Sequence, residues 1–223
     1  LCASRGDNEI SKILLKKGAN INLKDSRGFT PLHCGALERK LHSLIFLLGY
    51  KTIDVNATNR ESSNVLHYFV RIPVTEDNVV LYRLVLDTLI VKGIEINAQN
   101  SHGEAPIHFA CMTSNIHSVA FLLERGADTN LQTHLGETPL HYAIRSGCLK
   151  LVRILMENGA DPTLKAEDGS TPVDVAEQYQ FMDVLDCLQA IIEEEIDGDI
   201  NSPLTSSMNS RIAKSNITRA GWL

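Results

Sequence analysis

The stretch GETPLHYAIRSGCLKLVRILMENGAD, residues 136–161, predicts a helix, a tight turn and a second helix. Thr138 can accept hydrogen bonds from the first free amides of a helix, and Pro139 suits the first helical position, where no N–H is needed. Apolar residues then recur at three- and four-residue steps until Gly147 interrupts them. The second helix is expected to end at Gly159, because glycine readily adopts the left-handed conformation that caps a helix. Each helix is too short to be stable alone in water.

Near-copies of this stretch recur along the chain at an almost constant spacing. The TPLH histidine at position 141 has counterparts at positions 33, 67 and 108, and Asp174 takes its place in the last copy. The successive intervals are 34, 41, 33 and 33 residues. A unit of about 33 residues that opens with TPLH is the sequence pattern of the ankyrin repeat. From Leu1 to Ile192 the chain therefore resembles the ankyrin-repeat family, and the Gly-Ala-Asp after the second helix agrees with this.

This resemblance implies an all-α fold, an ankyrin-repeat solenoid of stacked helix-turn-helix units with turn or hairpin loops between them. We expect an array over residues 1–192, divided into a partial repeat at 1–24, repeats at 25–59, 60–99, 100–133 and 134–166, and a C-terminal capping repeat at 167–192. Polar residues stand where a further repeat would pack on the last unit, which is typical of a cap. Residues 193–223 form an acidic and then serine-rich, basic tail or linker, of a composition that usually stays disordered. The alignment places Leu1 inside a first helix, so we expect a fragment of a longer protein.

Two units depart from the pattern. Lys51 stands where the second unit should have its cap glycine, so a left-handed cap is not expected there. In the third unit eight extra residues follow Pro73, which should close the first helix. They predict a loop at 74–78 and a lengthened second helix at about 78–91. Insertions in repeat arrays fall in loops, often on a binding face. Two interpretations remain open, a protrusion that contacts a partner and a loop that is merely tolerated.

Composition excludes several classes of function. The formal net charge is −6, which argues against nucleic acid as the main partner, because phosphate binding requires a basic surface. No long apolar run or secretory signal is present, so we expect no membrane span and a cytoplasmic location, with the nucleus as the other possibility. The five cysteines show no metal-ligand spacing and are expected to be free thiols.

The eight histidines raise the question of an enzyme. Four of them occupy the TPLH position, which in the ankyrin family is structural and bonds the loops between repeats. No nucleophile, histidine and carboxylate stand in a recognisable catalytic motif, and no glycine-rich phosphate-binding motif occurs. His102 and His134 lie one repeat apart on turns and are the best metal candidates, but exposed turn histidines are usually only solvated. We therefore expect no catalytic site, no cofactor and no metal.

The resemblance instead implies protein binding, on a concave surface built from the turns and the first helices. The candidate partner-binding residues at those positions are Arg27, Phe29, Arg60, Arg71, Ile72, His102, Met112, Thr113, His134, Leu135, Arg145, Ser146 and Tyr179. Basic residues lie in the early units and acidic ones in the late units, a polarity that would orient a complementary partner. Ile72, Met112 and Arg145 are expected to share one position in three consecutive units, with an ambiguity of one residue for Ile72.

We accordingly predict a non-enzymatic protein-protein interaction module, monomeric as an isolated segment, within a larger intracellular protein. The sequence does not identify the protein partner. The alternative is a regulatory or targeting segment of a multidomain enzyme, such as a small-GTPase regulator or a protein kinase. That alternative rests on family analogy, because ankyrin arrays often accompany such domains.

Overall fold

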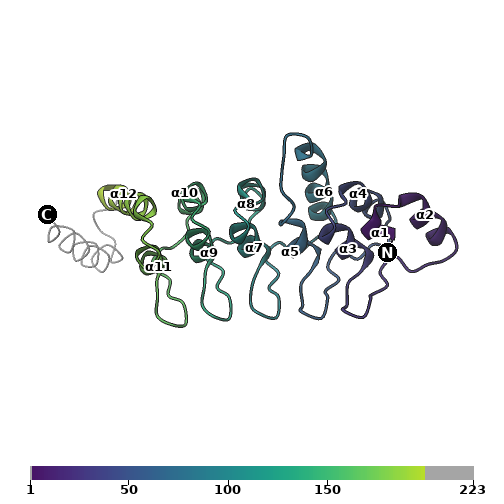
Figure 1. The fold of residues 1–223 in the computed structure, drawn as a ribbon, viewed down its shortest axis with the longest axis horizontal. Coiled ribbons are helices and arrows are strands. Elements are labelled where there is room, and N and C mark those ends of the chain that lie inside the picture. The colour runs from purple at the N-terminus through teal and green to yellow at the C-terminus, as the bar shows by residue number, and fades with distance from the viewer. Residues whose placement is uncertain (1, 199–223) are drawn as a thin grey trace.

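The chain folds into pairs of short antiparallel helices joined by hairpin-like turns (Figure 1). A computed structural model describes residues 2–198, and the side chains of residues 2–191. The described residues form helices and no strand. The helices are α1 (Cys2–Arg5), α2 (Asn8–Lys16), α3 (Pro31–Leu37), α4 (Leu41–Leu48), α5 (Val65–Phe69), α6 (Val79–Val91), α7 (Pro106–Met112), α8 (Ile116–Leu123), α9 (Pro139–Arg145), α10 (Leu149–Glu157), α11 (Pro172–Gln178) and α12 (Met182–Gly198). The predicted all-α solenoid is confirmed.

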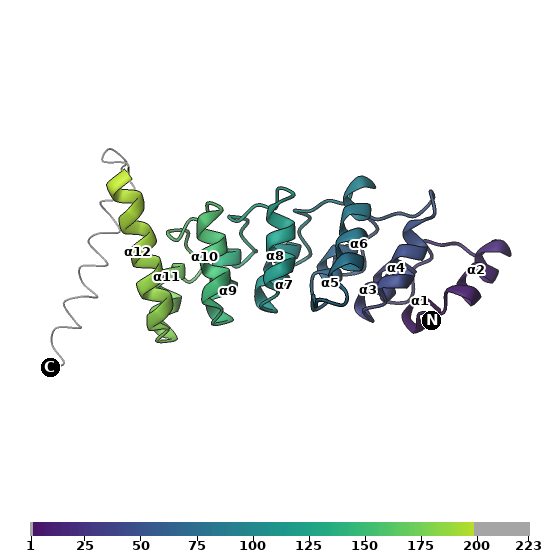
Figure 2. The same ribbon diagram turned by 90° about the horizontal axis from the view of Figure 1, so that it is seen from above.

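The helices form two rows, and the turns project beyond one of them (Figures 1 and 2). The first helices α3, α5, α7, α9 and α11 each pack on the next along the chain. The second helices lie in the other row, where α4 contacts α6 and α10 contacts both α8 and α12. We call the surface formed by the first helices and the turns at 24–29, 58–63, 99–104, 132–137 and 165–170 the inner surface.

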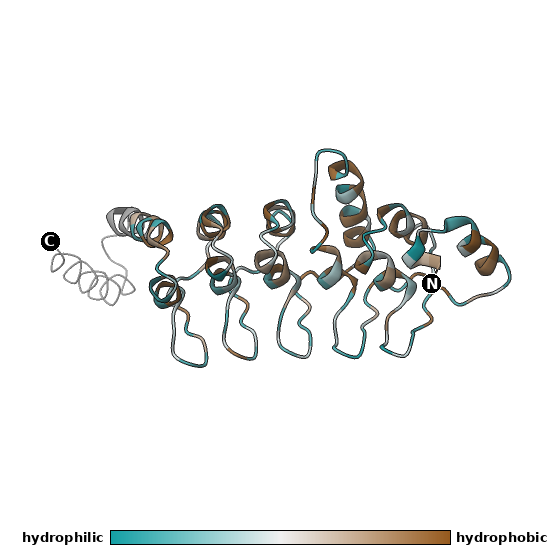
Figure 3. Ribbon diagram, viewed as in Figure 1, coloured by the Kyte–Doolittle hydropathy of each residue, from teal (hydrophilic) through white to brown (hydrophobic). Residues whose placement is uncertain are grey.

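The first helices α3, α5 and α11 each begin after a residue whose side chain accepts from a free amide of the helix, whereas Ala105 before α7 offers no such acceptor. Thr30 accepts from the His33 amide at 3.4 Å, and Pro31 follows at the first helical position. Asn64 replaces threonine in the third unit and accepts from the Leu66 amide at 3.1 Å. The apolar faces of the two rows pack together, and Figure 3 shows most of the apolar residues on the helices rather than on the turns. This pattern is that of stacked amphipathic helices.

The repeat histidines link each unit to the next. Each ring accepts the backbone N–H of its own helix cap at Nδ1, with distances of 3.0–3.3 Å. Its Nε2 faces a carbonyl oxygen near the next turn, namely Ser63 for His33 (3.1 Å), Glu104 for His67 (3.1 Å), Leu131 for His108 (3.1 Å) and Ser170 for His141 (3.4 Å). Asp174 keeps the cap bond to the Thr171 amide at 2.8 Å, but a carboxylate has no N–H to donate to a further unit. This substitution suits the last repeat.

An asparagine ladder that the sequence patterns did not reveal runs parallel to the histidines. Asn97 donates from Nδ2 to Gly126 O at 3.2 Å, and its Oδ1 accepts from the Asp128 amide at 3.0 Å. The same pair of bonds joins Asn22, Asn56 and Asn130 to the units that follow them. Thr163 occupies the position in the unit 134–166. Consecutive units are therefore held in register both at the start of the first helix and after the end of the second.

The third unit has the predicted lengthened helix but loses part of its first helix. The observed α6, Val79–Val91, confirms the expected helix at about 78–91. The expectation that Pro73 closes the first helix is wrong, since α5 already ends at Phe69. Asn115 explains the early end, because its Nδ2 donates to the carbonyls of Val70 (2.9 Å) and Ile72 (2.7 Å) and ties this segment to the turn before α8.

The ends of α4 and α12 were also predicted from the sequence. Gly49 has φ −65°, so α4 lacks a left-handed cap, as Lys51 in the cap position predicted. The last helix α12 continues to Gly198, beyond the end of the array expected at 192, so the first residues of the acidic run are helical. The rest of the predicted tail, 199–223, lies outside the described residues.

Close packing of the turns leads to a test at Gly103. It has φ +74°, and an added Cβ would lie 2.5 Å from the His134 backbone nitrogen. Gly126, at φ +85°, has nothing within 4 Å of such a Cβ. Gly126→Ala should cost about 1 kcal/mol of left-handed strain. Gly103→Ala should cost about 1–3 kcal/mol more, because two turns must separate. Urea unfolding, monitored by circular dichroism, measures the free energy of unfolding of both variants. Equal losses of this free energy would contradict the packing argument.

Candidate partner-binding surface

Backbone hydrogen bonds hold the turns of the inner surface side by side. Each turn donates an amide to a carbonyl of the turn before it, through Arg60 to Arg27 (3.1 Å), Ser101 to Glu61 (2.8 Å), His134 to His102 (2.9 Å) and Glu167 to Leu135 (2.7 Å). Gln99 adds side-chain bonds to Gly103 O (2.7 Å) and Gln132 O (2.8 Å). Side chains that project from this ladder are thus held by a continuous framework, which reduces the ordering cost of binding.

The predicted contact residues divide into three groups by exposure. The exposed group is Arg27, Arg60, His102, Met112, Thr113, His134, Leu135, Arg145 and Tyr179. Arg71 and Ser146 are partly buried. Phe29 and Ile72 are buried, with 8% and 3% of their surface exposed. The structure therefore brings eleven of these residues to the surface and removes two.

Phe29 and Ile72 are corrections to the prediction. The Phe29 ring lies 5.2 Å from the Tyr68 ring, and the Arg27 guanidinium covers it at 4.7 Å. Ile72 belongs to the core, because the chain turns inward after the short α5. This also resolves the one-residue ambiguity of the alignment. Arg71, and not Ile72, matches Met112 and Arg145 in the neighbouring units.

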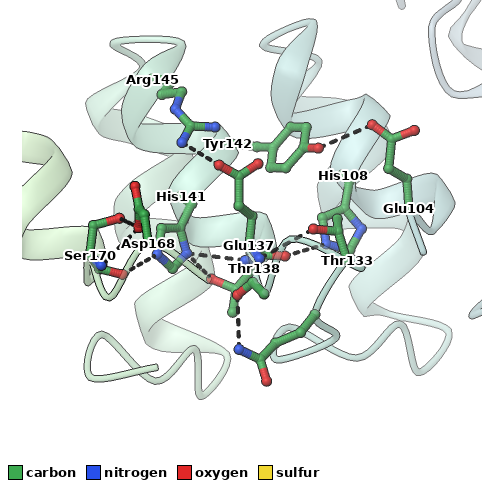
Figure 4. Close-up of polar contacts among 12 residues, drawn as sticks. Glu104, His108, Thr133, Glu137, Thr138, His141, Tyr142, Arg145, Asp168 and Ser170 are labelled. Carbon is green, nitrogen blue, oxygen red and sulfur yellow. Dashed lines mark hydrogen bonds and ion pairs between the residues drawn. The ribbon is translucent and has the colours of Figure 1, made fainter. Parts of the chain in front are cut away.

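The acidic half of the inner surface is largely paired within the protein (Figure 4). Glu137 forms an ion pair with Arg145, and this hydrogen bond raises the pKa of the guanidinium. Glu104 accepts from the Tyr142 hydroxyl at 3.0 Å and from Asn100 Nδ2 at 2.9 Å. Burial and the Glu104 charge raise the pKa of Tyr142. The Glu104 carboxylate therefore links two neighbouring units, and the Glu137 carboxylate is paired within its own unit. The polarity inferred from sequence is weaker here than the residue types suggest.

The basic half is less fully paired. Arg27 lies 3.9 Å from Asp25, and Lys24 Nζ donates to Thr58 O at 2.6 Å. Arg60 is exposed and forms no ion pair with a described carboxylate. The Arg71 guanidinium lies 4.1 Å from the Phe109 ring centre and 5.7 Å from that of Tyr68. Arg71 was predicted as a contact residue, but no sequence pattern indicated that its guanidinium would lie over rings of two units, Tyr68 and Phe109.

The side chains of residues 2–191 were also considered as metal ligands. No group of three or more His, Cys, Asp or Glu side chains is placed to hold a metal ion. His102 and His134 are both exposed, and their turns meet through the backbone. All five cysteines are free thiols. Among the described helices, none combines the length and apolar character that crossing a membrane requires.

Comparison with known proteins agrees with this architecture. The family model for ankyrin repeats (3 copies) matches residues 1–71 and 80–166, so the chain belongs to the ankyrin-repeat family. The gap between the two matched parts, 72–79, contains the inserted loop. Ankyrin repeat domains are typically non-catalytic and generally serve as protein-protein interaction modules.

Three similar proteins illustrate the range of the family. A probable serine/threonine-protein kinase of Dictyostelium discoideum is 35% identical over 125 residues, which cover 52% of this chain and 14% of that protein. An ankyrin repeat domain from Acinetobacter baumannii has a TM-score of 0.72 at 23% identity, covering 85% of this chain and 95% of that one. The ankyrin repeat domain of Bcl-3, an IkappaB family member, has a TM-score of 0.70 at 20% identity, covering 85% and 83%. The two solved structures are similar in fold alone.

Proposed function

We propose that this chain binds a protein partner on its inner surface, the concave face of an ankyrin solenoid, as part of a larger intracellular protein. The observation that carries the proposal is a set of large apolar and aromatic side chains exposed on a rigid polar framework. Leu37, Met112, Leu135 and Tyr179 are 41%, 47%, 59% and 48% exposed, and all lie on turns or at the ends of first helices. Such residues, interspersed with arginines, are typical of binding hot spots.

Binding to an extended protein segment suits this geometry better than binding to a small molecule. The exposed anchors lie in four different units, at 25–59, 100–133, 134–166 and 167–192, and are thus spread along the array. The expected monomeric state, the cytoplasmic or nuclear location and the preference for protein over nucleic acid remain predictions.

The second candidate is that this segment regulates or targets a catalytic domain elsewhere in the same protein. The similarity to the Dictyostelium protein named as a kinase favours this version, since the matched region covers only 14% of that protein. A protein kinase or a small-GTPase regulator would fit, and in either case the inner surface remains the binding element. Extending the sequence beyond residue 223 would distinguish the two versions.

The test compares two surfaces of the chain. Binders are selected from random 12-residue peptides displayed on phage, against the 223-residue chain, and their affinities are measured. Met112→Glu with Leu135→Glu should weaken binding at least about tenfold, because two hot-spot anchors are lost. The matched control is Val80→Glu with Val91→Glu on α6, where the native side chains are 75% and 86% exposed.

The control pair should leave affinity unchanged, and circular dichroism should show equal helix content in all variants. Loss of binding in the α6 pair alone would place the site on the outer helices. That result would overturn the proposal and favour the interpretation of the third-unit insertion as a partner-contacting protrusion.

A further inference from the structure

Arg71 is an arginine of the inner surface whose side chain is held in place by aromatic rings but whose charge is not paired with a carboxylate of the described residues. It follows the end of α5, and the two rings under its guanidinium come from its own unit (Tyr68) and the next (Phe109). Arg27 and Arg145 also lie on this surface, but each is near a carboxylate of its own unit, Asp25 and Glu137. Arg71 forms no ion pair with any carboxylate in the described part of the chain.

The exposure of its nitrogen atoms shows which donors are available. The Nε of Arg71 is buried and has no hydrogen-bond partner among the described residues. The two Nη groups also form no hydrogen bond there but are not among the buried atoms, so they meet solvent. Stacking on an aromatic ring occupies the face of a guanidinium and leaves its in-plane N–H groups free. Arg71 thus presents a fixed pair of donors at the inner surface.

A carboxylate is the group that such donors fit best. Its two oxygens can accept two parallel N–H bonds from a guanidinium, and these bonds are about twice as strong as those between neutral groups. Because the rings already restrict the Arg71 side chain, little rotamer freedom remains to be lost on binding. The low polarity of the Phe109 ring, itself 7% exposed, strengthens the attraction further.

The surrounding charges favour an acidic partner at this point, although the whole chain carries −6. Exposed Arg60 and Lys24 lie on the turns of the same half of the inner surface. Exposed Glu61, on the turn of the same unit, offsets part of this positive charge. Glu104 and Glu137 add little repulsion, because they are bound to Tyr142 and Arg145. Complementary charge of this kind steers association and fixes register.

We propose that Arg71 is the anchoring subsite for an aspartate or glutamate side chain of an acidic protein segment bound on the inner surface. This inference rests on the proposed function and specifies the chemistry of the partner. It makes Arg71 a specificity-determining residue, with Phe109 as the residue that positions it.

The test selects random 12-residue peptides on phage, displayed without a free carboxyl terminus, against the 223-residue chain and two variants. Arg71→Met removes the charge and keeps an apolar side chain over Phe109. Arg153→Met removes the same charge from an exposed position on α10. Peptides selected on the native chain and on Arg153→Met should share an Asp or Glu at one position, and peptides selected on Arg71→Met should lack it.

A double-mutant cycle on one selected peptide completes the test. Arg71→Met should weaken its binding at least about tenfold, as should the Glu→Gln or Asp→Asn change in the peptide. The two changes together should cost no more than either alone. Arg71→Lys keeps the charge and replaces Arg71→Met in the test if that variant does not fold. Its affinity for the peptide should lie between those of the native chain and Arg71→Met.

Inner-surface peptides without an acidic position, or an acidic peptide with equal affinity for Arg71→Met, would overturn this inference and leave the proposed function intact. Binders insensitive to Met112→Glu with Leu135→Glu would instead contradict the proposed function itself.

Discussion

Lowering the pH from 7 to 5 is expected to reduce the free energy of unfolding by more than about 2 kcal/mol, since the four repeat histidines are buried. Burial is the largest cause that lowers the pKa of His33, His67, His108 and His141 in the folded chain. For His67 the pKa falls to about 4. Its bonds to Glu104 O and Asn64 favour the protonated ring, and burial outweighs them.

The sign follows from proton uptake by the two states. The unfolded chain protonates its histidines near pH 6.5, whereas folded His67 stays neutral until about pH 4. The stability contributed by the neutral ring is therefore complete above pH 6.5 and is lost progressively as the pH falls from 6.5 to 4. At pH 5 the loss from His67 alone is about 2 kcal/mol, and the other three act in the same direction.

Urea unfolding at pH 7, 6 and 5 measures this loss, and a matched variant assigns it. His67→Gln should lower stability at pH 7 but reduce the further loss between pH 7 and 5 by about 2 kcal/mol. Asp25 and Asp168 have lowered pKa values as well, through hydrogen bonds to Phe29 and Ser170, but their contribution disappears only below about pH 4. A stability that does not change from pH 7 to 5 would mean that the rings are not buried as neutral groups.

These histidines also show why the fold was predictable from sequence. The histidine, the helix start and the cap glycine each satisfy a local requirement that recurs in most units, so one regular unit predicts its neighbours. The lengthened α6 was predicted from the longer interval between His67 and His108 alone. Where the local requirement changed, prediction failed. The helix α5 ends at Phe69, and Asn115, 45 positions from Val70, donates to the carbonyls of Val70 and Ile72 that follow it.

The candidate site was less predictable, because its side chains meet across units. Tyr142 and Glu104 are 38 positions apart, and nothing in either unit alone reveals their bond. The asparagine ladder was missed for a different reason. Asn22, Asn56, Asn97 and Asn130 do recur at the repeat spacing, so a position-by-position comparison of the units would have found them. Phe29 is buried against Tyr68 of the next unit. Its position on a turn, where side chains are usually exposed, gave no reason to expect this.

Truncating either of two equivalent core leucines should give the largest loss of stability of any single change considered. Leu122 and Leu155 each lie four residues before a cap glycine, and both are 0% exposed. Leu→Ala at either position should cost about 2–5 kcal/mol, because buried methyl groups are lost and a cavity remains. The cost should be large because each leucine lies in a second helix that contacts another second helix of the row, so rearrangement cannot close the cavity easily.

Leu14 provides the matched control, since it holds the same position before Gly18 in the first unit and is 46% exposed. Leu14→Ala should cost less than about 1 kcal/mol, because little apolar surface returns to water and no closed cavity forms. The chemistry of the three changes is identical, so a difference in urea midpoint reports burial alone. Equal costs at Leu14 and Leu155 would contradict the assigned register of the repeats, and with it the placement of Met112, Arg145 and Arg71 on one surface.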